Sequence, residues 1–325
     1  MRRLGSVLAL VIFTACGPTA SGTGGNGNGN GNGNGNGADG GGGGNWPDAN
    51  GHPPTEFADA APVQACDKMD ILFVVDNSGS MGQEQTNLAD NFPQFIQVLD
   101  NYDPPLDYRV GITTTGIDYD YTMDLGGGFT IPSSQTGGDN GALLQRCDMT
   151  RRWVESGDTN RSATFSCAAE VGADGPADEM PLAAMHKAFD ARMSDGTNAG
   201  FHRDDALLAI VILTDEDDCS YEQSVTLGLG ESLCTDKMEM VDTYKSFLDQ
   251  YTGAAGRWAV AVIAGVTDCS SDFGGAQEAT RLKQFASLAG TNGVVSSICE
   301  ADLSIGLQDA LDTFDSACQS FPPIN

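Results

Sequence analysis

Three oxygen-bearing side chains stand at alternate positions at the end of a short apolar run. The run begins at Asp70, and Asp76, Ser78 and Ser80 end it in the pattern D-x-S-x-S. An apolar run of this length, bounded by turn residues, is typical of a strand buried on both faces. Hard divalent cations bind carboxylate and hydroxyl oxygens, and open α/β sheets bind ligands at the carboxyl ends of their strands. The stretch therefore predicts a cation site at a sheet edge.

A second apolar run ends in the same way. The predicted strand Leu207–Thr214 is followed directly by Asp215. A strand ending in D-x-S-x-S, then a helix, with Thr214-Asp215 later in the chain, resembles the von Willebrand factor A (VWA) family and its metal-ion-dependent adhesion site. The alternative is an ordinary helix N-terminus, in which Ser or Asp caps free N–H groups.

The resemblance covers about Met69 to Cys318. It implies an α/β fold with a doubly wound, mainly parallel sheet, helices on both faces and one short antiparallel edge strand. The alternation of strand and helix patterns along the chain independently indicates such a sheet.

The resemblance also implies a set of metal ligands. Ser78 and Ser80 would coordinate the ion directly, and Asp76 and Asp215 directly or through water. The family's third loop normally adds a threonine, but residues 172–182 contain none. Glu179 is the expected replacement.

Other assignments remain open at this position. Asp178 is a second candidate ligand, and Thr113–Thr115 could line the site from the other side. Glu179 could instead be a solvated acid in the first turn of a helix, where the macrodipole favours it. The expected ion is Mg²⁺, or else Mn²⁺ or Ca²⁺. A carboxylate in place of the hydroxyl would raise cation affinity and weaken the ion's attraction for an external carboxylate.

The N-terminus has the pattern of an export signal. Arg2 and Arg3 precede an apolar stretch, Leu4–Ala15, that is too short to span a membrane stably. Phe13–Cys16 resembles a bacterial lipobox, which implies a lipid on Cys16 and residues 1–16 as a lipoprotein signal. The alternative is a secretory signal cleaved near Ala15. We expect an exported, membrane-anchored protein of the outer membrane or cell surface of a bacterium.

Residues 17–65 are rich in Gly and Asn, so we expect a disordered tether there and a VWA-like domain over residues 66–321. The whole chain carries a net charge of −29; residues 1–65 hold two basic and four acidic residues, so the rest carries −27. This acidity argues against nucleic acid as a partner. It indicates solubility and repulsion between copies of the chain, hence a monomer. The alternative is additional calcium sites in the acidic loops 118–124 and 215–218. Neither loop matches an EF-hand.

The chain has nine cysteines, and assigning Cys16 to the lipid leaves eight, an even number that indicates disulfides in an exported protein. Eight cysteines allow 105 connectivities. Proximity along the chain favours three pairs, and the two cysteines left over would tie the ends of the domain together. The resulting pairs are Cys147–Cys167, Cys219–Cys234, Cys269–Cys299 and Cys66–Cys318. The rival hypothesis is a zinc site, but no C-x₂-C pair occurs and the three histidines stand apart from the cysteines.

Further elements follow from periodicity. Pro93 predicts a kink or a late helix start, and Gly111 a close backbone approach. We expect His186 and Ile305 to face the core, and Gly128–Ile131 to be the antiparallel edge strand. Residues 116–178 show no long pattern. The expected helices are Gln83–Tyr102, Met180–Met193, Asp236–Tyr251, Gln277–Ala289 and Leu303–Phe314, and the other expected strands are Tyr108–Thr113, Trp258–Ile263 and Gly293–Ser297.

The sequence contains no nucleophile elbow, P-loop or dinucleotide fingerprint. We therefore expect a binding module rather than an enzyme, namely a surface-tethered lipoprotein that coordinates a divalent cation and binds a protein or extracellular-matrix ligand. The alternative is a structural or assembly subunit of an envelope complex, in which the metal only stabilises the fold. A metal-dependent hydrolase is a third hypothesis.

Overall fold

A computed structural model of the chain describes residues 66–322 except 103–104, 222–223, 272–273 and 301. The chain divides into the units 1–57 and 58–325, and everything below belongs to the second. The predicted signal (1–16), the lipid on Cys16 and the predicted tether (17–65) lie outside the described residues. Within those residues, no helix is both long enough and apolar enough to cross a bilayer.

The first predicted strand is the middle of the main sheet. It is β1 (Lys68–Val75), and the strand order is β11-β8-β6-β1-β2-β5. Five strands run parallel, and β5 (Trp153–Glu155) pairs antiparallel with β2. β6 and β8 are buried along their whole length, as parallel strands covered on both faces should be. The other parallel strands are β2 (Asp107–Thr114), β6 (Leu207–Leu213), β8 (Trp258–Ala264) and β11 (Gly293–Ser297).

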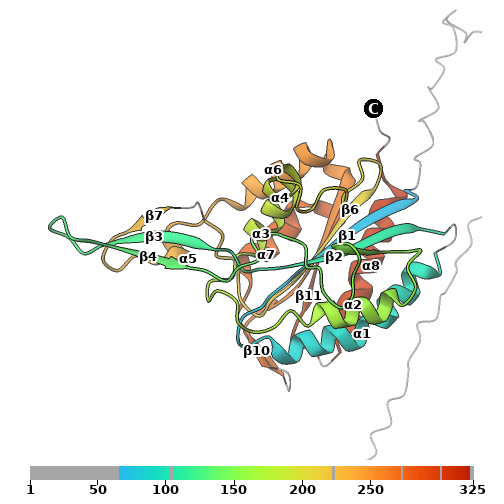
Figure 1. The fold of residues 1–325 in the computed structure, drawn as a ribbon, viewed down its shortest axis with the longest axis horizontal. Coiled ribbons are helices and arrows are strands. Elements are labelled where there is room, and N and C mark those ends of the chain that lie inside the picture. The colour runs from blue at the N-terminus through green and yellow to red at the C-terminus, as the bar shows by residue number, and fades with distance from the viewer. Residues whose placement is uncertain (1–65, 103–104, 222–223, 272–273, 301, 323–325) are drawn as a thin grey trace, which may run out of the picture. The chain divides into compact units, whose positions relative to one another are not determined.

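Helices cover both faces of this sheet, so the prediction of a doubly wound α/β fold is confirmed (Figure 1). Alternate residues of β1 pack on opposite sides: Phe73 lies among α1, α2 and α8, and Leu72 among α3, α6 and α7. The first group is α1 (Gly82–Asp100), α2 (Arg161–Ala169) and α8 (Ser304–Gln319). The second group is α3 (Pro181–Phe189), α6 (Val241–Thr252) and α7 (Thr280–Leu288). Short helices are α4 (Ala191–Ser194), α5 (Leu233–Asp236), η1 (Ala255–Arg257) and η2 (Gly290–Asn292).

Several details differ from the sequence predictions. α1 begins at Gly82 and continues through Pro93, so the predicted late start is wrong. Ile305 is 53% exposed, because the buried stripe of α8 consists of Leu307 and the apolar residues that follow it at helical spacing. A Cβ on Gly111 would meet side chains, those of Phe201 and Leu143, rather than backbone.

A second sheet extends from the end of the main sheet (Figure 1, left). β3 (Tyr119–Asp124) and β4 (Thr130–Gln135) form an antiparallel hairpin, and β7 (Val225–Leu227) pairs parallel with β3. The prediction that Gly128–Ile131 is the edge strand of the main sheet is therefore wrong. These residues form the hairpin turn and the start of β4, and the edge strand is β5. A further hairpin consists of β9 (Cys269–Ser271) and β10 (Gly274–Ala276).

Four disulfides are present, with the predicted pairings. Cys66–Cys318 joins a residue two positions before β1 to the last turn of α8, across 252 residues. The backbone N–H of Cys66 also donates to the Cys318 carbonyl at 3.0 Å. The two ends of the folded unit are therefore fastened together.

Candidate metal centre

The turn after β1 places the D-x-S-x-S side chains at the carboxyl edge of the sheet. The Asp76 backbone N–H donates to the Leu213 carbonyl of β6 at 2.9 Å. One Asp76 carboxylate oxygen accepts from the Ser78 N–H at 2.7 Å, and the Ser78 and Ser80 hydroxyl oxygens are 3.0 Å apart. No side chain caps the start of α1, so the helix-cap alternative does not explain the motif.

The end of β6 contributes the second pair of residues. The Thr214 hydroxyl donates to the other Asp76 carboxylate oxygen at 2.6 Å. Asp215 is 5% exposed; its carboxylate accepts a hydrogen bond from Ser80, but its Oδ1 has no partner. The two strand ends, far apart in sequence, thus bring Asp76, Ser78, Ser80 and Asp215 together.

A third segment, immediately before α3, adds Glu179. The Gln85 side-chain amide donates to the carbonyls of Asp76 and Gly172, each at 2.8 Å, and so holds this segment against the turn after β1. Glu179 is 1% exposed, and Thr115 donates a hydrogen bond to its Oε2. Its Oε1 is buried without a partner. Glu179 is therefore not a solvated helix-terminal acid.

The other sequence candidates for this position are engaged elsewhere. Asp178 accepts a hydrogen bond from the Tyr119 hydroxyl at 2.6 Å. Thr113 and Thr114 donate to the Ala142 carbonyl at 3.1 Å and to the Asp139 carboxylate at 2.7 Å. Of these three threonines, only Thr115, which directly follows β2, is directed at the site.

Burial dominates the electrostatics of these carboxyl groups. Burial raises the pKa of Asp76, whose carboxyl is in contact with that of Glu179. Burial and then the charge of Asp76 raise the pKa of Glu179 to about 9. Burial also raises the pKa of Asp215, with a further contribution from the Asp76 charge. Buried carboxyl groups in contact need a proton or a cation between them, and their all-oxygen surroundings suit a hard divalent ion.

Sequence reasoning missed one buried acid of this cluster, Glu84 in the first turn of α1. Glu84 is 4% exposed, and its Oε2 has no partner. Burial, followed by the charges of Asp215 and Asp76, raises its pKa. Helical spacing was the available signal, because Glu84 stands four residues before Leu88 on the inward face of the helix.

In the acidic loops considered as calcium sites, three carboxylates besides Asp215 accept contacts from the fold itself. Asp118 accepts from the Gly138 N–H and the Asn140 side chain, each at 2.9 Å. Asp217 accepts from backbone N–H groups at the start of α7, and Asp218 pairs with Arg281 at 2.9 Å. These contacts use oxygens that a calcium ion would need.

One compact group of His, Cys, Asp or Glu ligand atoms occurs within the described part of the chain, all within 4.8 Å of one another. It consists of Asp178, Cys219 and Cys234. The two sulfurs are bonded to each other in a disulfide, so this group does not match a zinc site. The carboxylates of Asp76, Asp215 and Glu179 do not form so compact a group. Ser80, next to Asp215, is exposed to solvent.

No protein-family model matches the chain, and neither does any curated protein. Among solved structures, proximal thread matrix protein 1 from the mussel byssus matches over 78% of this chain and 49% of its own, with a TM-score of 0.44 and 10% identity. The pilus adhesin SpaC from Lactobacillus rhamnosus GG, in its open conformation, matches over 79% and 30%, with a TM-score of 0.40 and 11% identity. The SpRpn10 VWA domain matches over 76% and 94%, with a TM-score of 0.35 and 12% identity. This chain thus spans about half of the first of these proteins and less than a third of the second.

Proposed function

We propose that this chain is an exported, VWA-like binding module that coordinates a divalent cation, with Mg²⁺ favoured over Mn²⁺ and Ca²⁺. Asp76, Ser78, Ser80, Asp215 and Glu179 are the proposed ligands. The main support is that three separate segments contribute buried carboxylates to this edge of the sheet, and that one oxygen of Glu179 and one of Asp215 accept no hydrogen bond.

A cation would remove the energetic cost of this arrangement. Buried, unpartnered anionic oxygens are costly unless something neutralises and coordinates them. Mg²⁺ takes oxygen ligands and keeps several waters, which suits a site with carboxylates inside and the exposed Ser80 outside. The open side is where a protein or matrix ligand would approach.

Three carboxylates around a doubly charged ion leave a negative balance. This balance favours a neutral oxygen, rather than a carboxylate, as the group that a partner offers to the ion. It also favours the alternative function, a structural subunit of an envelope complex in which the ion only stabilises the fold.

Binding rather than catalysis is proposed because the two described histidines lie away from this site. His186 packs against the Phe247 ring, with a centroid distance of 4.2 Å. His202 lies 3.4 Å from Asp70, near the opposite end of β1. The prediction of a core position for His186 is correct only in part, because its side chain is half-buried.

The N-terminal predictions complete the proposal. Lipidation at Cys16 would anchor the protein to a membrane, and residues 17–65 would act as its tether. The proposed location is the outer membrane or surface of a bacterial cell, with the module presented as a monomer.

Calorimetric titration of the full chain with Mg²⁺ and Mn²⁺ tests the metal site. We expect saturable binding by the wild type, no binding by Asp76→Asn, and affinity at least about tenfold lower in Glu179→Gln. Glu170→Gln makes the same charge change at an exposed residue and is the matched control, expected to bind as the wild type does. The absence of saturable binding in the wild type would refute the metal site.

Partner binding separates the two functions. A module that uses the ion for binding should lose partner affinity in EDTA and in Asp76→Asn alike. An assembly subunit should keep its partner while its unfolding midpoint falls when the ion is removed. Hydrolytic turnover abolished by EDTA would contradict both and support the hydrolase hypothesis.

A further inference from the structure

The projecting sheet β4-β3-β7 has two faces of opposite chemistry. In register, Met123 lies beside Ile131 of β4 and Leu227 of β7, while Thr122 lies beside Pro132 and Thr226. Side chains alternate between faces along each strand, which sorts the residues into two sets. The apolar face contains Tyr119, Tyr121, Met123, Ile131, Val225 and Leu227, with Ser133 and Gln135 beside the two tyrosines. The polar face contains Asp120, Thr122, Asp124, Thr130, Pro132, Ser134 and Thr226.

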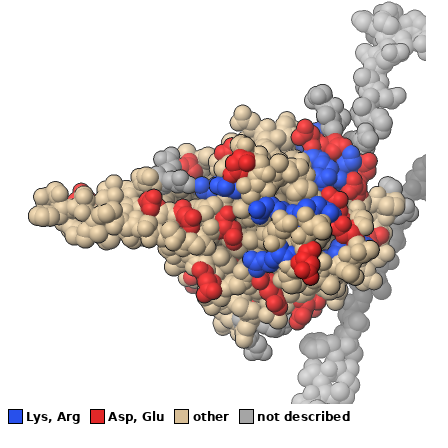
Figure 2. Space-filling view, viewed as in Figure 1, with Lys and Arg blue, Asp and Glu red and all other residues tan. Residues whose placement is uncertain are grey.

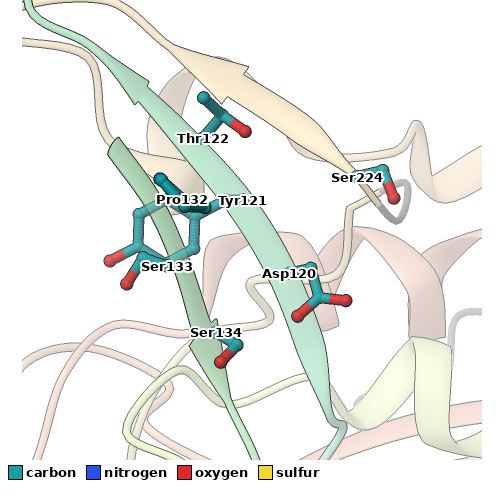
Figure 3. Close-up of a pocket in the computed structure, with 7 residues that line it drawn as sticks. All are labelled: Asp120, Tyr121, Thr122, Pro132, Ser133, Ser134 and Ser224. Carbon is teal, nitrogen blue, oxygen red and sulfur yellow. The ribbon is translucent and has the colours of Figure 1, made fainter. Parts of the chain in front are cut away.

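The polar face is suited to water. It bears an open hollow of about 420 Å³, whose lining includes Asp120, Thr122, Ser134 and Ser224. Figure 3 shows the oxygen atoms of these side chains along the strands. Hydroxyls and a carboxylate can all hydrogen-bond to solvent, so this face needs no protein cover.

The apolar face is covered near its base and on its β7 side. Tyr119, at the base, and Leu227, level with Met123 on the β7 side, are each 6% exposed and belong to the same apolar cluster as Leu233 of α5. Toward the far end the exposed fraction rises to 39% for Met123 and 50% for Ile131. The apolar pattern therefore continues beyond the part that the fold itself buries.

Five exposed apolar residues gather at this far end and form what we call the distal apolar patch. Phe129 and Leu229 are 73% and 74% exposed. The patch is Met123, Leu125, Phe129, Ile131 and Leu229. In the described part of the chain, only three other large apolar side chains are exposed, and they lie outside this sheet: Met240, Val266 and Ile305. Scattered exposed residues are ordinary, but a gathered set marks an interaction surface.

The hairpin turn holds the patch in place. The Leu125 N–H donates to the Phe129 carbonyl at 2.9 Å, and the Phe129 N–H donates to the Gly126 carbonyl at 3.2 Å. Gly126, Gly127 and Gly128 adopt left-handed backbone conformations, with φ of 81°, 63° and 84°, which glycine accepts without strain. A turn already ordered by its own hydrogen bonds lowers the entropic cost of binding.

We propose that the distal apolar patch docks onto a protein partner whose surface has an apolar centre and a cationic rim. Asp120 and Asp124 lie on the opposite, polar face of the same sheet, and residues 117–136 and 224–232 contain acidic residues but no Lys or Arg. The far end of the sheet shows no blue atoms in Figure 2. Charge complementarity thus favours a basic partner over a second copy of this acidic chain or an anionic membrane.

Docking uses the face of the sheet rather than its edge. The outer strand β4 contains Pro132, which has no N–H to donate to an added strand. A proline at this position blocks pairing along the edge. The interface is therefore built from side chains, with Phe129 at its centre. This surface is separate from the proposed metal ligands, so its occupation does not require the ion.

Selection of a random peptide library against the full chain in EDTA tests the proposal. The selected peptides should combine apolar residues with Lys or Arg, and their affinity should fall as salt rises. We expect Phe129→Ser and Leu229→Ser each to lower the chain's affinity for a synthetic copy of a selected peptide by at least about tenfold. Met240→Ser and Ile305→Ser, which remove exposed apolar side chains elsewhere, are the matched controls and should leave its affinity unchanged.

Because all four variants alter exposed residues, unchanged thermal unfolding will show that each is folded. Selection of peptides without basic residues, or equal loss in the controls, would overturn the proposal. So would binding to phosphatidylcholine or phosphatidylglycerol vesicles that Phe129→Ser abolishes, which would assign the patch to a membrane. A concentration-dependent dimer that the same variant abolishes would assign it to a second copy. Since EDTA is present throughout, failure of the metal site would not affect these results.

Discussion

Among the four disulfides, Cys66–Cys318 should be the one whose removal destabilises the protein most, when both cysteines are replaced by Ser. This bridge closes a loop of 252 residues, and the other three bypass 20, 15 and 30 of them, which leaves about 190 effective residues. The chain-entropy relation gives about 5 kcal/mol for such a loop and about 3 kcal/mol for the 15-residue loop of Cys219–Cys234.

For metal affinity we expect the opposite order: removal of Cys219–Cys234 should have a larger effect than removal of Cys66–Cys318. The Cys219–Cys234 bridge fastens the loop that follows Asp215 to α5, and the Cys219 N–H donates to the Glu179 carbonyl at 2.7 Å, so loss of the bridge should loosen the segment that bears Glu179. Cys66 and Cys318 lie near the other end of β1. The variant with serine at 219 and 234 should therefore bind Mg²⁺ more weakly than the Cys66/Cys318 variant, while losing less stability.

Urea unfolding without reductant, with extrapolation to water, measures the stability of both double variants. Calorimetry on the same samples measures Mg²⁺ affinity. The reasoning is refuted if the Cys66/Cys318 variant loses less than about 1 kcal/mol, or if the 15-residue bridge proves the more stabilising. In either case, structure remaining in the unfolded chain, rather than loop length, would control the effect.

Three smaller perturbations test the packing and the electrostatics by urea unfolding. Phe165→Ala removes a buried ring stacked on Phe92 and should cost about 3–5 kcal/mol; a cost near that of a surface mutation would contradict the position of α2. Arg281→Met leaves the fully buried Asp218 without its ion-pair partner and should cost about 3–5 kcal/mol, whereas little loss would mean that the pair is unimportant. Burial lowers the pKa of His186, so the folded state favours the neutral ring, and this stabilisation is lost as pH falls below the ordinary histidine pKa. The wild type should therefore lose more stability than His186→Phe between about pH 7 and pH 5.5, and parallel losses would exclude this effect.

The elements predicted correctly from the sequence are those whose burial is uniform. β6 and β8 are apolar at almost every position, and β11 was predicted with its observed bounds. Short elements were missed, because three residues such as Trp153–Glu155 show no period. The hairpin β3–β4 does alternate in register, but its apolar face is half exposed, so its composition resembles that of a loop.

The proposed metal ligands were all named from the sequence through its resemblance to the VWA family, and the meeting of strand ends at one edge of a parallel sheet accounts only for those that follow β1 and β6. What the sequence did not show is how the third segment approaches. The contacts of Gln85 with Gly172, and the position of Glu84, depend on packing between segments distant in the chain. For the same reason, the sequence did not show that Thr115, rather than Thr113 or Thr114, contacts Glu179.

The Cys66–Cys318 disulfide has a mechanical consequence. Cys66 precedes β1 at its amino end, and the proposed ligands of the ion lie at its carboxyl end, so a pull between the preceding chain and a captured ligand would act along this strand. β1 is hydrogen-bonded to parallel neighbours on both sides, β2 and β6. Such a load shears all of those hydrogen bonds together instead of opening them one by one, and the disulfide passes part of the tension directly to α8. The covalent bridge thus lies where such a load would enter the folded unit.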